Sequence, residues 1–282
     1  MRKWIWTLII GCALLFGGWF IVEQTLRDTA SQQYEKTTIP TLFIHGYGSS
    51  YRAEEQMTKA IVKAGVTKNV IRANVAKDGN VKLSGVLPQN AYNPLVEVDF
   101  SDNKQTDQHK NGKYLKNVLV KLQKTYGFKK FNVVAHSMGN MAVAYYMLDN
   151  ASDKSLPKLQ KQVDLAGHYN GILGLNDEPK TYALQENGLP YDQTETYKEL
   201  SALKEKYPKA QVQVLNIYGD LDDGSNSDGR VNNDSSKALA ALLKGRARSY
   251  QELEIKGEKG QHSKLHESAK VDRAIIDFIW KK

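Results

Sequence analysis

Short apolar runs alternate with amphipathic segments along most of the chain. Residues 95–100 alternate apolar and polar side chains with a period of two, which is typical of a β-strand. Leu115, Val118, Leu119 and Leu122 recur at the spacing of one helical face, so the segment around them predicts a helix. Read along the whole chain, these patterns predict strands at residues 41–44, 70–75, 81–83, 95–100, 131–135, 162–166, 212–218 and 250–255, and helices at 54–64, 113–126, 141–148, 195–207, 236–243 and 265–280.

The repeated order of strand and helix predicts the fold class. It favours an α/β fold with a mainly parallel sheet that helices cover on both faces. Residues 170–193 break the periodicity and are rich in Gly, Asn, Asp and Pro. We therefore expect a lid-like loop near residues 167–193, lying over one edge of the sheet.

The N-terminus carries an apolar segment of its own. Residues 4–22 contain no charged side chain, Arg2 and Lys3 precede them, and Trp residues lie at both ends. About 20 apolar residues can span a bilayer as a helix, and the preceding positive charges favour a cytoplasmic N-terminus. We therefore predict a single-pass signal anchor and tether at residues 1–36 and an extracellular domain at residues 37–282.

Alternative interpretations of that segment stay open. Cleavage of a signal peptide would release the body as a secreted protein, and Ile9-Ile10-Gly11-Cys12 resembles a lipoprotein signal. All three export interpretations place the body outside the cytoplasm. A buried apolar helix is the remaining alternative.

Composition and charge exclude several classes. The 282 residues include 39 Lys and Arg against 31 Asp and Glu, and this net charge of +8 is spread along the chain, so we expect no nucleic-acid partner. The single cysteine can form neither an internal disulfide nor a thiolate zinc site. Phosphate-binding, dinucleotide-binding and His-Glu-x-x-His motifs are absent from the sequence, so we expect no cofactor and no metal.

The strongest chemical signal surrounds Ser137. A β-rich run ends at this serine and an apolar helix is predicted to follow at once. A sharp strand-to-helix turn needs small residues two positions before and after its apex, and here those are Ala135 and Gly139. This pattern predicts a nucleophilic serine. The alternative is that Ser137 only caps the helix that follows it.

His45-Gly46-Tyr47-Gly48 follows the first predicted strand of the body. Acyl transfer needs two N–H donors directed at the developing oxyanion. We expect the backbone N–H groups of Tyr47 and Met138 to supply them. We also expect a substrate pocket near Tyr47, His168, Tyr169 and the loop 170–193.

A base and an acid should come later in the chain. His262 follows the last predicted strand through a Gly-rich loop, and we prefer it to His266 as the base. Asp228 begins an Asp-Gly-Arg-Val segment and is our preferred acid, with Asp220 and Asp222 as alternatives closer to the preceding strand. Residues 220–231 do not fit an EF-hand calcium loop.

The segments 42–48, 135–139, 228–231 and 262–266 together resemble the α/β-hydrolases, in which serine, acid and histidine follow in this order. In particular they resemble the membrane-associated, lipase-like cell surface hydrolases of Gram-positive bacteria, a family of unknown function called DUF915. The segment 135–139 is also similar to that of small secreted bacterial lipases. Asn140 and the acidic loop before Asp228 depart from the simpler lipases.

The resemblance implies hydrolase chemistry without a cofactor. We expect a membrane-bound serine hydrolase that cleaves a carboxylic ester, small or lipid-like, through Ser137, Asp228 and His262. An amidase or a thioesterase would use the same residues. A non-catalytic module that binds the cell envelope on a hydrolase fold is the alternative from a different class.

Overall fold

The structure is a computed structural model that describes residues 33–175 and 177–282. The apolar segment 4–22 and its cysteine lie outside the described residues, and so does the membrane anchor predicted from that segment. Within the described part, the helices are too short or too polar to cross a bilayer.

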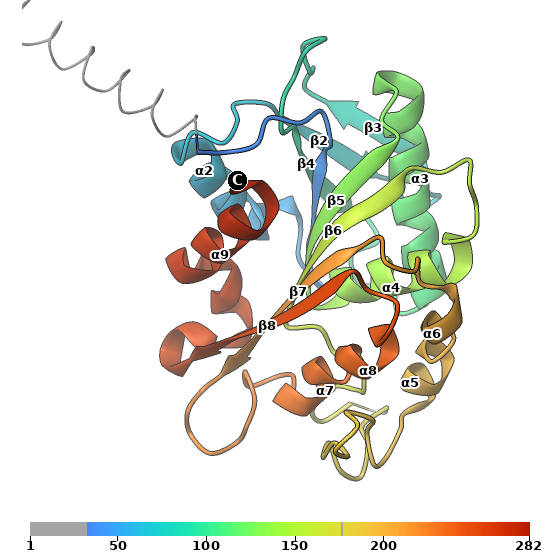
Figure 1. Ribbon diagram of the computed structural model, residues 1–282, viewed down its shortest axis with the longest axis vertical. Coiled ribbons are helices and arrows are strands. Elements are labelled where there is room, and N and C mark those ends of the chain that lie inside the picture. The colour runs from blue at the N-terminus through green and yellow to red at the C-terminus, as the bar shows by residue number, and fades with distance from the viewer. Residues whose placement is uncertain (1–32, 176) are drawn as a thin grey trace, which may run out of the picture.

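Eight described strands form one sheet in the order β3-β2-β4-β1-β5-β6-β7-β8 (Figure 1). Each is parallel to its neighbours except β3, which pairs antiparallel with β2 and closes one edge. The strands are β1 (Thr41–Ile44), β2 (Val70–Val75), β3 (Val81–Ser84), β4 (Leu95–Phe100), β5 (Lys130–His136), β6 (Lys158–Leu165), β7 (Gln213–Asp220) and β8 (Ser249–Lys256).

Helices cover both faces of this sheet (Figure 1). In chain order the described helical elements are η1 (Tyr51–Ala53), α2 (Glu55–Lys63), α3 (Gln108–Tyr126), α4 (Met138–Asn150), α5 (Glu195–Leu200), α6 (Leu203–Lys206), α7 (Asn233–Lys237), α8 (Leu239–Leu243), η2 (Gly257–Gly260), η3 (His262–Glu267) and α9 (Ala269–Trp280), where η marks a 3-10 helix. The α/β fold with a mainly parallel sheet is thus the one that the alternation of strands and helices predicts.

Strand β1 shows how the sheet divides the core. Leu42 and Ile44 pack in the cluster that includes α3, α4, α5 and α8, whereas Phe43 packs with α2 and α9. Neighbouring side chains of a strand point to opposite faces, so a strand covered on both sides must be apolar throughout. This is why the central strand appears in the sequence as an unbroken apolar run.

Three predicted helices are shorter or broken in the structure. The predicted helix 195–207 divides into α5 and α6, and at the division the Ser201 hydroxyl donates to the Tyr197 carbonyl over 3.1 Å. The predicted helix 236–243 divides into α7 and α8 at Ala238. The predicted helix 265–280 begins only at Ala269, because Ser268 is extended and the preceding turn is the 3-10 helix η3.

The segment between β6 and α5 is the predicted lid-like loop. Its described residues contain one isolated bridge, between Leu184 and Pro190. Buried Asn170 connects the two ends of the loop, because its side chain donates to the Asp192 carbonyl (2.9 Å) and accepts from the Thr194 N–H (3.0 Å). Movement of this loop as a lid stays a prediction.

The described chain begins at the amino ends of the parallel strands. Tyr34 is buried and bridges to Lys281, and the Glu35 N–H donates to the Trp280 carbonyl over 2.7 Å. Residues 34–36, which the sequence analysis places in the tether, therefore pack against the end of α9.

His109 joins three helices. Its ring nitrogens lie 2.8 Å from the carboxylates of Asp149 in α4 and Glu199 in α5. Tyr145 packs edge-on against the imidazole and donates its hydroxyl to Glu199 over 2.6 Å. The hydrogen bonds to Asp149 and then to Glu199 raise the pKa of His109.

We expect His109→Gln to lower the melting temperature in mildly acidic buffer and to have little effect in alkaline buffer. Because the folded state raises the histidine pKa, its stabilisation is complete below the unfolded value of about 6.5 and disappears as the pH rises through the folded value. The side chain is half exposed, so the effect should be small, about 0.5 kcal/mol or 1–2 °C. Thermal unfolding of both proteins at pH 5.5 and 8.5 tests this, and an equal loss at both values would contradict it.

Candidate active site

Ser137 lies at the sharp turn where β5 ends and α4 begins. Its φ is 52° and its ψ is −120°, a backbone conformation that costs a non-glycine residue of order 1–3 kcal/mol. The Ser137 N–H donates to the Leu165 carbonyl at the end of β6 over 2.9 Å. The turn thus presents the hydroxyl at the carboxyl edge of the sheet, as the flanking small residues predict.

The glycine after the turn is required by space. A Cβ on Gly139 would lie 2.5 Å from the Ile44 carbonyl oxygen, which is much closer than side-chain carbons approach backbone oxygens. A Cβ on Gly46 would lie 3.0 Å from the Cβ of Ser137. Both glycines therefore allow the end of β1 to approach the turn closely.

Ser137, His262 and Asp228 form one continuous chain of contacts. His262 Nε2 lies 3.0 Å from Ser137 Oγ, and His262 Nδ1 lies 2.7 Å from Asp228 Oδ2. The second carboxylate oxygen of Asp228 accepts the N–H groups of Arg230 (2.8 Å) and Val231 (2.7 Å). The carboxylate is therefore held in place by its own Asp-Gly-Arg-Val turn.

The alternative residues are occupied elsewhere. Asp220 accepts hydrogen bonds from the Asn233 side chain and the Asp222 N–H, both over 2.7 Å. Asp222 itself is exposed and lies 3.9 Å from Lys256. His266 packs edge-on against the His136 ring. Of the candidates that the sequence left open, only His262 and Asp228 contact each other beside Ser137 in the described structure.

His136 is a contributor that the sequence analysis did not assign. Its Nε2 lies 3.0 Å from the His262 backbone carbonyl, and the two rings are 4.8 Å apart. Burial lowers the pKa of His136 well below its usual value. The neutral ring must carry its proton on Nε2, because a carbonyl oxygen can only accept, and it thereby fixes the backbone of His262. The signal in the sequence for such a role is a histidine at the end of an otherwise apolar strand.

The predicted oxyanion donors lie beside the serine. Tyr47 follows β1 and Met138 begins α4, and the register pairs Ile44 with Ala135, so both segments end at the same edge. Tyr47 and Met138 line a cavity of about 660 Å³ together with Ser137 and His262. The N-terminus of α4 also provides a favourable environment for negative charge at this point.

The residues that line this cavity can be compared with those of the predicted substrate pocket. His168 lines it, and burial lowers the pKa of this histidine to about 4, so the imidazole is neutral at neutral pH. Tyr169 is instead fully buried in the core on the α3 and α4 side of the sheet. Arg230, Gln261 and Ser263 also line the cavity. In the described ranges, three or more His, Cys, Asp or Glu side chains never gather as metal ligands.

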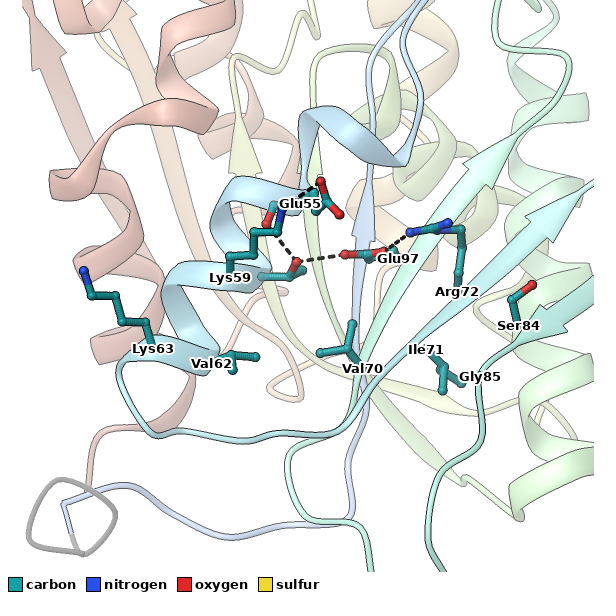
Figure 2. Close-up of a pocket in the computed structure, with 11 residues that line it drawn as sticks. Glu55, Lys59, Val62, Lys63, Val70, Ile71, Arg72, Ser84, Gly85 and Glu97 are labelled. Atoms are coloured by element: carbon teal, nitrogen blue, oxygen red, sulfur yellow. Dashed lines mark hydrogen bonds and ion pairs between the residues drawn. The ribbon is translucent and has the colours of Figure 1, made fainter. Parts of the chain in front are cut away.

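A second hollow of about 540 Å³ lies between α2 and the strands β2 and β3 (Figure 2). Arg72 donates to Glu97 over 2.9 Å, the Thr58 hydroxyl donates to the same carboxylate over 2.9 Å, and Lys59 pairs with Glu55. These charges neutralise one another, and the hollow shares no lining residue with the cavity at Ser137. The reactive arrangement therefore belongs to the other cavity.

Comparison with known proteins agrees with this architecture. The family described as "Alpha/beta hydrolase of unknown function (DUF915)" matches residues 28–282. The chain belongs to this DUF915 family of α/β-hydrolases. No curated protein matches the sequence.

Two solved structures show the same fold. The product of gene lin2722 of Listeria innocua is 28% identical, with a TM-score of 0.78 over 86% of this chain and 94% of that chain. A protein from Lactobacillus plantarum WCFS1, provisionally named a cell surface hydrolase, is 20% identical, with a TM-score of 0.68 over 86% of this chain and 89% of that chain.

Asn140, where the sequence departs from the simpler lipases, has a structural role in this DUF915 protein. Its side-chain amide donates to the Leu165 carbonyl over 2.8 Å, the oxygen that also accepts the Ser137 N–H. Asn140 is fully buried. It therefore supports the turn from the helix side.

We expect Asn140→Ala to destabilise the protein by about 1–2 kcal/mol, because a buried hydrogen bond is lost and a small void remains. The melting temperature should fall by roughly 2–6 °C. Differential scanning fluorimetry measures this, with Asn90→Ala as the matched control, because Asn90 is exposed. Equal melting temperatures for Asn140→Ala and the wild type would contradict a supporting role.

Proposed function

We propose that this protein is a serine hydrolase that cleaves a carboxylic ester through an acyl-enzyme. The single observation that carries the proposal is the unbroken contact chain from Asp228 through His262 to Ser137. Membership of the α/β-hydrolase family supports hydrolase chemistry in general. An amide or thioester substrate would require the same residues.

In the proposed reaction each of these residues has a role. Ser137 Oγ attacks the carbonyl carbon while His262 Nε2 takes its proton, and Asp228 stabilises the resulting imidazolium. The N–H groups of Tyr47 and Met138 stabilise the oxyanion. When the tetrahedral intermediate collapses, the C–O bond breaks and His262 gives its proton to the leaving alcohol. Water then attacks the acyl-enzyme by the same route and releases the acid.

We further propose that the hydrolase acts at the cell surface. The apolar segment 4–22 with its preceding positive charges supports export and anchoring. One structural relative carries the provisional name of a cell surface hydrolase. In this proposal residues 1–36 attach the domain to the membrane and the domain itself is extracellular.

We expect a fluorophosphonate probe to label the full-length protein in detergent and to leave Ser137→Ala unlabelled. Asp228→Asn should lower kcat for p-nitrophenyl acetate about 10⁴-fold, because the histidine loses the group that orients it. Asp222→Asn, an exposed carboxylate in the same loop, is the matched control and should keep wild-type kcat. Labelling at a residue other than Ser137 would refute the proposed triad. A folded wild type that neither reacts nor hydrolyses would refute the enzyme and favour a non-catalytic envelope-binding module.

A further inference from the structure

The catalytic cavity meets a second cavity of about 400 Å³, which we call the inner chamber. The two share the wall residues Thr106, Gln108, His168, Ile172 and Leu175. Beyond these, the inner chamber is lined by Met141, Gly171, Asp177 and Thr196. Its walls therefore come from α4, the β6–α5 loop, α5 and the segment before α3.

The surface of the inner chamber suits an uncharged aliphatic group. Most of the exposed wall is apolar, contributed by side chains such as Met141, Ile172 and Leu175. His168 is neutral because burial lowers its pKa to about 4. The carboxylate of Asp177 accepts the Thr196 hydroxyl over 2.6 Å. Pockets that bind small molecules combine such apolar walls with a few polar groups.

The positions of the reactive groups indicate which half of an ester, acyl or alcohol, would enter the inner chamber. His262 must protonate the leaving alcohol, so the alcohol lies on the histidine side of the carbonyl carbon. Gln261, His262, Ser263 and His266 line the catalytic cavity, but none of them lines the inner chamber. Met141 instead lies one turn along α4 from Met138, beside the nucleophile. The chamber wall thus includes Met141 and none of the segment 261–266, which favours the acyl half of the ester as its occupant.

We propose that the inner chamber binds the acyl chain of the substrate, an unbranched aliphatic chain of medium length. This inference rests on the proposed function, since it assigns a substrate class to the same site. A cavity of about 150 Å³ holds one benzene molecule, so about 400 Å³ accommodates a chain of roughly eight to twelve carbons. Each methylene that enters should raise kcat/KM about fourfold until the chamber is full.

The test fills the entrance of the chamber with a larger side chain. Ile172 and Leu175 belong to both cavities, so Ile172→Trp and Leu175→Trp should narrow the connection between them. Leu173 lies between them in sequence and lines neither cavity, so Leu173→Trp is the matched control. Leu175 is half exposed, so Leu175→Trp keeps the test valid if Ile172→Trp does not fold.

Each full-length protein is assayed with two series of esters. One series varies the acyl chain from two to twelve carbons with a constant p-nitrophenol leaving group, and the other varies the alcohol chain of alkyl acetates. For the wild type we expect the highest kcat/KM at a medium acyl chain. The two narrowing variants should lower kcat/KM on that ester at least tenfold more than kcat/KM on p-nitrophenyl acetate or on the alkyl acetates, and Leu173→Trp should behave as the wild type.

The outcomes separate this inference from the function on which it rests. If Ser137 is labelled and acetate is hydrolysed, but the narrowing variants keep the wild-type acyl profile, the acyl assignment is wrong and the serine hydrolase stands. A loss confined to the alkyl acetates with long alcohols would assign the chamber to the leaving group and overturn the proposal. No labelling of Ser137 and no hydrolysis of any ester would overturn both.

Discussion

The close approach of two backbone segments at the carboxyl edge of the sheet determines the whole site. The helix that begins at Met138 can pass the end of β1 only because Gly139 has no side chain, since a Cβ there would lie 2.5 Å from the Ile44 carbonyl. That approach forces Ser137 into its strained conformation and sets the loop at Tyr47 beside it. The Leu165 carbonyl completes the arrangement by accepting hydrogen bonds from both Ser137 and Asn140. Ser137 and the proposed oxyanion donors are therefore fixed by packing of the sheet.

The histidine and the acid are held by a second set of backbone contacts. The His262 N–H donates to the Asp228 carbonyl over 2.9 Å, while His136 contacts the His262 carbonyl. The carboxylate of Asp228 is buried and accepts two N–H groups of its own turn. The imidazole thus has little freedom to rotate away from Ser137. Preorganisation of this kind is what acyl transfer requires, because no rearrangement is then needed as charge develops.

Most of the sheet and the contacts among Ser137, His262 and Asp228 in the candidate site could be predicted from the sequence, and the physical reasons differ. Strands such as β1 and β4 are apolar because both faces are covered, so their pattern is visible locally. Ser137 and His262 are 125 residues apart, but each stands after a predicted strand, and parallel strands bring their carboxyl ends to one edge. The breaks at Ser201 and Ser268 depend on single hydrogen bonds and backbone angles, which apolar periodicity does not record. The inner chamber is assembled from four separate segments, and the pocket expected near His168 and the loop 170–193 indicated only one of them.

The position at which the described chain joins the domain has a consequence for the side from which substrate reaches the cavity. Tyr34 packs beside the amino ends of the parallel strands, and Ser137 lies at their carboxyl ends, about 20 Å away along the seven residues of β5. The point at which the proposed anchor would join the domain therefore lies at the opposite edge of the sheet from the cavity. Under the proposed anchoring, the cavity would open away from that point, toward substrate that arrives from the aqueous side.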